Sequence, residues 1–217
     1  MTYSEENYLK VIYHLSLNQN KGITTNSIAN EMESKPSSVT DMVQKLADKG
    51  LVIYKKYQGV SLTDEGMFTA LMIVRKHRLW EVFLLEKLDF SWDEVHEVAE
   101  QLEHIQSAKL VDKLEEFLNF PEFDPHGDPI PKANGEMPVI AKKLLSELRA
   151  GDTCKVVAVK DTSTLFLQYL EKLQITIGTE IKLIEVIDFD GSIYIQIGDA
   201  EPRMVSMKFA ESLFVRR

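Results

Sequence analysis

The chain contains very little cysteine and no long apolar run. Only one of its 217 residues, Cys154, is a cysteine, which excludes a disulfide framework and any zinc site built of thiolates alone. No segment approaches the roughly 20 consecutive apolar residues of a membrane span, so we expect no membrane partner. The N-terminus is acidic and shows no apolar signal core. We therefore expect a soluble, cytoplasmic protein.

The sequence also lacks the short motifs of several enzyme classes. It has no Gly-Lys-Ser/Thr phosphate-binding loop, no G-x-G-x-x-G and no G-x-S-x-G. The segment His96–Glu100 is not an H-E-x-x-H zinc motif, because glutamate stands in place of the second histidine. Cys154 has no histidine near it in the sequence and is expected to be a buried structural thiol. These absences argue against an enzyme.

Charge is distributed unevenly along the chain. The net charge of -9 would by itself argue against a nucleic-acid partner. Residues 1–76, however, carry 9 basic and 8 acidic side chains, whereas residues 77–140 carry 5 and 15. Residues 141–217 carry 11 of each. This asymmetry suggests two roles: a neutral-to-basic head, and an acidic body whose carboxylate repulsion bound cations would relieve.

The first third of the chain has the pattern of a winged helix-turn-helix. Apolar spacing predicts a helix over residues 8–15, a short one after Thr25, and a third from Pro36 to a stop at Gly50. Residues 51–54 and 60–62 predict a β-hairpin. In such a module the third helix enters the major groove and the hairpin touches the DNA backbone. The candidate DNA contacts are the polar residues of that helix and the basic wing: Ser37, Ser38, Thr40, Asp41, Gln44, Lys45, Lys55, Lys56 and Tyr57.

The rest of the chain divides into a helical and a strand-rich part. Residues 64–118 predict two long helices, the second preceded by a capping box at Ser91–Glu94. Residues 120–138 hold five of the seven prolines and predict an irregular linker. Beyond residue 148, short strands and the turn signal Asp188–Gly191 predict a small β-barrel.

Carboxylates and imidazoles recur at helical spacing inside the acidic region. Offsets of three and four place Glu100, Glu103 and His104 on one helix face, and His77 and Glu81 repeat the spacing on the preceding helix. Mixed oxygen and nitrogen donors suit a divalent metal, although a solvated helix face is the alternative interpretation. Further candidates of the same kind are His96, Asp124 and His126.

Five linked motifs carry a resemblance to a known family. They are Glu6–Tyr13, Pro36–Leu46, Gly59–Gly66, Arg75–Glu81 and His96–His104. Together they closely resemble the diphtheria toxin repressor family, and within it the manganese-responsive transport regulators, over essentially the whole chain. The resemblance implies a homodimeric transcriptional repressor that is activated by Mn²⁺ or Fe²⁺. Such a repressor binds palindromic double-stranded operator DNA and controls metal-uptake genes.

The resemblance also implies the architecture. We expect an α+β fold with three domains: a winged helix-turn-helix DNA-binding domain at residues 1–63, a helical metal-binding and dimerisation domain with a Pro-rich linker at 64–138, and a small SH3-like β-barrel at 139–217. The last resembles the domain found in ferrous iron transport protein A.

By position, the resemblance implies a set of metal ligands and leaves the number of sites open. Glu100, Glu103 and His104 match the family's main ligands, and Asn7 falls where the family places Asp or Met. His77 matches a ligand of the main or the neighbouring site, and Glu81 and His96 match the second site. Asp124 and His126 fall where some relatives with the barrel have ligands, and Asp161 is a candidate contribution from the barrel itself.

Several departures from the family pattern affect what is expected. Glu100 replaces the cysteine of the iron-type members, and a carboxylate in place of a thiolate favours Mn²⁺ over softer metals. Asn7 supplies a neutral oxygen. Lys10 stands where the two-manganese branch has Glu, which argues against a paired-manganese site. Asp41 replaces a common Gln, so the operator sequence does not transfer.

The mechanism expected from this pattern is mechanical. Metal at Glu100, Glu103 and His104 would draw in the first helix near Asn7 and so limit the swing of the DNA-binding head. Both heads of a dimer would then sit a whole number of DNA turns apart. Two alternatives stay open at this point: a winged-helix regulator that senses an organic ligand, and a metal-dependent hydrolase that uses the same cluster.

Overall fold

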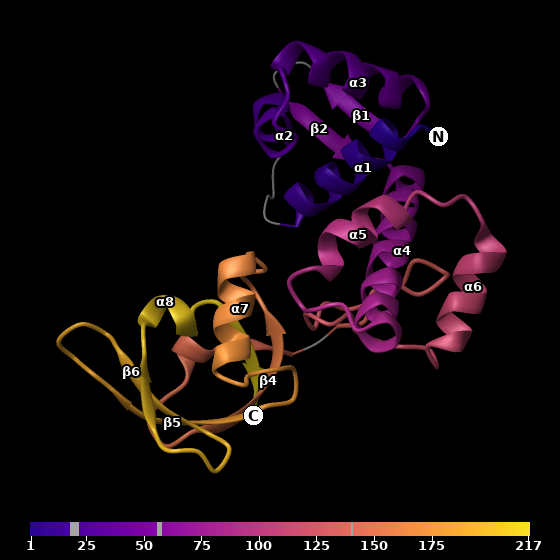
Figure 1. Ribbon diagram of the computed structural model, residues 1–217. Coiled ribbons are helices and arrows are strands. Elements are labelled where there is room, and N and C mark those ends of the chain that lie inside the picture. The colour runs from indigo at the N-terminus through magenta and orange to yellow at the C-terminus, as the bar shows by residue number, and fades with distance from the viewer. Residues whose placement is uncertain (18–21, 56–57, 140) are drawn as a thin grey trace. The chain divides into compact units, whose positions relative to one another are not determined.

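The structure is a computed structural model that describes residues 1–17, 22–55, 58–139 and 141–217, and these form two compact units (Figure 1). The first unit comprises Met1–His77, Glu100–Val111 and Pro131–Met137, and the second Arg78–Ala99, Asp112–Ile130 and Pro138–Arg217. Each unit encloses an apolar core of its own. The predicted DNA contacts Lys56 and Tyr57 lie outside the described residues.

The three helices at the start of the first unit are delimited by local signals. Helix α1 (Tyr3–Ser16) begins with a capping box between Thr2 and Glu5, and α2 (Thr25–Glu31) begins at Thr24, whose side chain accepts from Ser27 N–H. Helix α3 (Pro36–Asp48) has proline in its first turn, where no amide hydrogen is needed. It ends before Gly50, whose φ of 72° is the left-handed conformation common after helices.

A two-stranded hairpin completes the winged helix. Strand β1 (Val52–Lys55) pairs antiparallel with β2 (Gly59–Leu62), and Ile23 exchanges two backbone hydrogen bonds with Val60 of β2. The buried residues beneath come from all three helices and the hairpin: Leu9, Ile12, Ile28, Val39, Val43, Leu46, Val52 and Val60. The helix and strand order predicted from the sequence is therefore confirmed (Figure 1).

The helical region differs from the prediction in one respect. Helix α4 (Asp64–Leu88) is long, as predicted, but the second long helix is two shorter ones, α5 (Val95–Leu102) and α6 (Ala108–Phe117). The break follows from Ser107, whose hydroxyl and carbonyl both accept from Leu110 N–H. A serine in this position starts a new helix more readily than it continues an old one. The turn between α5 and α6 therefore carries Glu103 and His104.

The strand-rich part of the second unit is a six-stranded antiparallel sheet. Its strands, in the order in which they pair, are β3 (Lys143–Leu144), β8 (Leu213–Arg216), β4 (Thr153–Val159), β5 (Glu180–Val186), β6 (Ile193–Ile197) and β7 (Arg203–Val205). Helices α7 (Thr164–Lys172) and α8 (Met207–Ala210) and the short 3₁₀ helix η1 (Leu145–Glu147) accompany the sheet. Cys154 is 3% exposed in this core and burial raises the pKa of its thiol to about 11, so the expectation of a buried structural thiol is confirmed.

The Pro-rich segment is irregular but firmly bonded. Residues 120–138 are all described and form no helix or strand, apart from one isolated β-bridge between Phe123 and Pro129. Within the second unit, Val159 N–H donates to His126 O at 2.9 Å, which fixes the segment against β4. Gly127 permits this contact, because its φ is 85° and an added Cβ would lie 2.0 Å from Val157 O.

We predict that Gly127→Ala strongly destabilises the protein. The substitution adds a clash with β4 to the strain of a positive φ, so unfolding free energy should fall by about 3 kcal/mol or more. Gly151→Ala is the matched control, because Gly151 has a φ of 92° but an added Cβ there meets nothing within 4 Å. It should lose only about 1 kcal/mol. Denaturant titrations of the two variants measure this, and equal losses would contradict the packing argument.

Candidate metal centres and nucleic-acid surface

A buried carboxylate forms the middle of the cluster in the first unit. Glu103, directly after α5, is fully buried, and its Oε2 lies 2.6 Å from His77 Nδ1 and 2.7 Å from Lys10 Nζ. Lys10 also forms an ion pair with Glu100. Although burial favours the protonated acid, the His77 hydrogen bond and the Lys10 charge hold the pKa of Glu103 below its ordinary value. Glu103 is therefore an anion at neutral pH.

The other oxygen of Glu103 lacks such support. Among the described residues, Glu103 Oε1, His104 Nε2 and Asn7 Oδ1 are buried atoms with no hydrogen-bond partner. Glu103 Oε1 lies 3.6 Å from His104 Nε2, too far for a hydrogen bond between them. Leaving several polar atoms buried and unsatisfied is costly. An oxygen–nitrogen set of this kind fits a divalent cation such as Mn²⁺.

The first turn of α1 holds the histidine of this cluster in place. Glu6 Oε2 lies 2.6 Å from His104 Nδ1, and its Oε1 accepts from Gln106 Nε2 at 2.6 Å. The Tyr3 ring lies 3.8 Å from the His104 ring, centroid to centroid. A carboxylate on one ring nitrogen is the usual support for a histidine that binds metal through the other. A cavity of about 370 Å³ in the same unit is lined in part by Asn7, Lys10 and Glu100.

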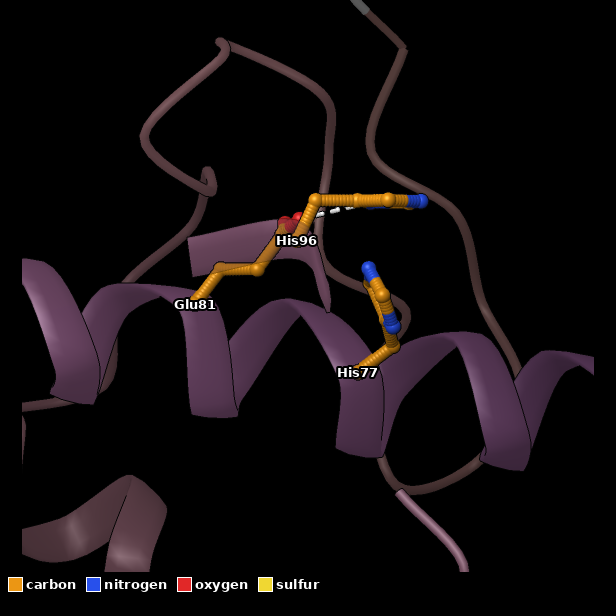
Figure 2. Close-up of side chains that lie close together, drawn as sticks. All are labelled: His77, Glu81 and His96. Carbon is orange, nitrogen blue, oxygen red and sulfur yellow. Dashed lines mark hydrogen bonds and ion pairs between the residues drawn. The ribbon is translucent and has the colours of Figure 1, made fainter. Parts of the chain in front are cut away.

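The second unit contains a separate cluster. Glu81, Asp124 and His126 are all buried, and each offers a ligand atom within 4.8 Å of the others. Glu81 Oε1 lies 3.2 Å from His96 Nδ1, and its Oε2 lies 3.8 Å from His126 Nδ1. Figure 2 shows Glu81 reaching from α4 to the His96 ring, with His77 one turn earlier on the same helix.

Charge crowding perturbs the groups of this second cluster. Burial and the neighbouring Glu81 carboxylate raise the pKa of Asp124 to about 7. Burial lowers the pKa of His126, but Glu81 and Asp124 outweigh it and raise that pKa above its ordinary value. Arg78 Nε lies 3.3 Å from Asp124 Oδ2 and supplies one compensating charge. The cluster therefore holds more negative charge than its own arginine offsets.

The loop that carries Asp124 is folded around its carboxylate. Asp124 Oδ1 accepts from His126 N–H at 2.8 Å and from Asp128 N–H at 2.9 Å. His126 Nε2 lies 3.2 Å from Trp92 O, and the two rings stack with centroids 5.9 Å apart. The supporting roles of Arg78 and Trp92 were not predicted from the sequence. For Arg78 a signal existed, since it precedes Glu81 by three residues on one helix face.

Asp161 lies in a turn of the second unit. It follows β4, and its Oδ1 accepts from Ser163 N–H at 2.9 Å. Hydrogen bonds from the side chain and the backbone of Ser163 lower the pKa of Asp161. It belongs to none of the metal-ligand groups found among the described residues. The geometry gives Asp161 the role of a turn-forming residue.

The candidate DNA-contacting face of α3 is exposed. Ser37, Ser38 and Asp41 of α3 are exposed to solvent, and so is Lys55 at the end of β1. The remaining three make local contacts: Thr40 Oγ1 donates to Pro36 O, Gln44 Nε2 donates to Asp48, and Lys45 Nζ lies 3.0 Å from Glu5 Oε1. The face therefore presents hydroxyl, amide and charged groups, while Val39, Val43 and Leu46 on its other side are buried.

Comparison with known proteins covers most of the chain. Residues 1–60 match the family model for the iron dependent repressor N-terminal DNA binding domain, and 63–132 match its metal binding and dimerisation domain. Residues 143–217 match the FeoA domain. Among the described residues, no helix is both long and apolar enough to cross a membrane.

Individual relatives agree with these matches. A solved structure named manganese-dependent transcriptional repressor complex with manganese is 34% identical, with a TM-score of 0.85, and the match covers 97% of this chain and 98% of that one. The iron-dependent repressor IdeR of Mycobacterium tuberculosis is 33% identical over 128 residues, 58% of this chain and 54% of that protein.

A third relative matches a shorter stretch. A probable metal transport system membrane protein of Chlamydia trachomatis is 46% identical over 87 residues, 40% of this chain and 19% of that protein. The chain thus spans about half the length of the mycobacterial relative and about a fifth of the chlamydial one.

These findings confirm both the predicted fold class and the resemblance to the diphtheria toxin repressor family. The relatives compared over most of the chain are transcriptional repressors that depend on manganese or iron. The chain belongs to the iron-dependent repressor family, with its DNA-binding, metal-binding and dimerisation, and FeoA domains in that order.

Proposed function

We propose that this chain is a transcriptional repressor that binds palindromic operator DNA as a homodimer when a divalent metal ion, Mn²⁺ or Fe²⁺, is bound. The observation that carries the proposal is that three buried atoms able to bind a metal have no hydrogen-bond partner. They are Asn7 Oδ1, Glu103 Oε1 and His104 Nε2. We retain the division into domains at residues 1–63, 64–138 and 139–217, which the ranges of the family matches support.

At the main site, the residues of this chain would hold one ion. Lys10 already places a positive charge between Glu100 and Glu103, on the side where His77 also bonds to Glu103. Glu103 Oε1 and the neighbouring His104 Nε2 are buried without a hydrogen-bond partner, as is Asn7 Oδ1, and the charge of Lys76 also acts on Glu103. An ion there would contribute charge and coordination bonds that join the first turn of α1 to the turn after α5. The absence of a thiolate favours Mn²⁺.

The second site would involve Glu81, His96, Asp124 and His126. Two buried carboxylates, Glu81 and Asp124, lie near Arg78 there, and burial together with the charge of Glu81 raises the pKa of Asp124 to about 7. A divalent ion would relieve the same repulsion without a proton. Asp161 is not part of this proposal, because its carboxylate is used by Ser163.

The dimer and the DNA complete the proposal. Phe117 and Phe120, at the end of α6, are large apolar side chains exposed to solvent, which supports a covering partner in the dimerisation domain. Two copies of α3 would then enter successive major grooves of the operator. Because DNA binding defines where such a repressor acts, we propose a cytoplasmic location. Family membership supports regulation of transcription rather than an enzymatic activity.

We predict that Glu103→Gln abolishes activation by metal. The amide keeps the shape of the side chain but removes the anion, so Mn²⁺ affinity should fall by about 100-fold or more. In gel-shift titrations, operator affinity with Mn²⁺ should drop to the metal-free value. Glu97→Gln is the control, because Glu97 is an exposed glutamate of α5 outside both clusters. A Glu103→Gln variant that still responds to Mn²⁺ would refute the site, provided that its circular dichroism is normal.

We predict two manganese ions per chain. Equilibrium dialysis followed by elemental analysis should yield two in the natural protein and about one in each of His104→Ala and His126→Ala. His14→Ala, which removes an exposed histidine of α1, should retain two. Three ions per chain would indicate a paired-manganese main site despite Lys10, and an unchanged count in both cluster variants would contradict the assignment.

For the DNA surface, we predict that two kinds of contact separate. Lys55→Gln should weaken binding to all sequences alike and reduce the slope of log affinity against log salt by about 1. Gln44→Ala should instead reduce discrimination at one operator base pair by about 1–3 kcal/mol. Binding titrations on operator and scrambled duplexes at several salt concentrations compare them, and identical profiles would contradict the docking of α3 in the groove.

A further inference from the structure

We propose that Glu5 is a positioning residue that couples the metal centre to the reading helix α3. The proposal rests on the metal site proposed at Asn7, Glu103 and His104. It goes beyond that site by naming the side chain through which occupancy reaches the DNA-binding surface.

The carboxylate of Glu5 is buried and joins α1 to α3. It lies in the first turn of α1 with 0% exposure, and its Oε1 is 2.7 Å from Lys49 Nζ and 3.0 Å from Lys45 Nζ. Its Oε2 accepts from Thr2 N–H at 2.9 Å. Separating a buried carboxylate from both lysines would leave it uncompensated, so α1 and α3 move together.

The next two residues face the metal centre instead. Glu6 bonds to His104 and Gln106, and Asn7 Oδ1 is buried without a hydrogen-bond partner, as are Glu103 Oε1 and His104 Nε2. Successive helix residues point about 100° apart, so one turn can contact two neighbours at once. Whatever orders Glu6 and Asn7 therefore also orders Glu5, and with it the two lysines.

The lysines remain available to DNA while Glu5 holds them. Their side chains are 52% exposed for Lys45 and 44% for Lys49, and Lys45 lies on the face of α3 proposed to meet the operator. Pre-ordered ammonium groups lose less conformational freedom when they meet phosphates. Metal binding would thus strengthen operator binding through Glu5, and by linkage operator DNA would strengthen metal binding by the same factor.

The variant Glu5→Gln tests this directly. Glutamine also serves at this position of a capping box, so the start of α1 is kept while the charge that holds the lysines is lost. We expect the ratio of operator affinities with and without Mn²⁺ to fall about tenfold. Calorimetric titration with Mn²⁺ in the presence of operator should show the reciprocal loss, whereas Mn²⁺ affinity of the DNA-free protein should stay within about threefold.

Thr2→Ala is the matched control for a merely structural role. It removes the hydroxyl that caps α1 but leaves the carboxylate and both lysines in place. Its ratio should stay close to the natural one. A ratio that Glu5→Gln leaves unchanged, or that Thr2→Ala lowers as much, would overturn the coupling. If instead His104→Ala binds Mn²⁺ as well as the natural protein, the metal site itself is wrong and the coupling falls with it.

Discussion

The buried Glu103 carboxylate is the constraint on which the first unit depends. An anion removed from water needs hydrogen bonds or nearby positive charge, and Glu103 receives both at Oε2 from Lys10 and His77, while the charge of Lys76 also acts on it. The other oxygen faces His104, itself without a second partner. Folding therefore brings together helix α1, helix α4 and the turn after α5 around the Glu103 carboxylate. A bound cation would interact with the oxygen of Glu103 that has no hydrogen bond.

The second unit repeats this arrangement with different residues. Glu81 and Asp124 are buried beside Arg78, as Glu100 and Glu103 lie beside Lys10. In both places a basic side chain offsets part of the repulsion between the carboxylates. The two clusters hold four of the 15 acidic side chains of residues 77–140, a stretch with only 5 basic ones. Their carboxylates are not all a solvated surface: several are buried groups that a divalent ion can bind.

Local signals explain which parts of the fold could be predicted from the sequence. Thr24, Pro36 and Gly50 each fix a helix end through their own backbone or side chain, and the winged helix follows from them. Ser107 was overlooked as a helix start, so one long helix was predicted where there are two. Glu6 with Gln106, and Arg78 with Pro129, are 100 and 51 residues apart, and no spacing rule predicts such pairs. Asp161 is matched by resemblance alone, and in the structure its carboxylate accepts from Ser163 N–H.

Three adjacent residues give the first turn of α1 its importance. Glu5 points to α3, Glu6 to His104, and Asn7 lies buried with its oxygen unsatisfied. A helix terminus is where order is least secure, since its first amides lack partners within the helix. Here Thr2 and Glu5 cap those amides, but the adjacent Glu6 bonds across to the turn that carries the metal ligands. The stability of this terminus therefore depends on the contact of Glu6 with His104, which a bound ion would strengthen. Because Glu5 joins the same turn to α3, a small free energy of metal binding can change the order of the DNA-binding helix.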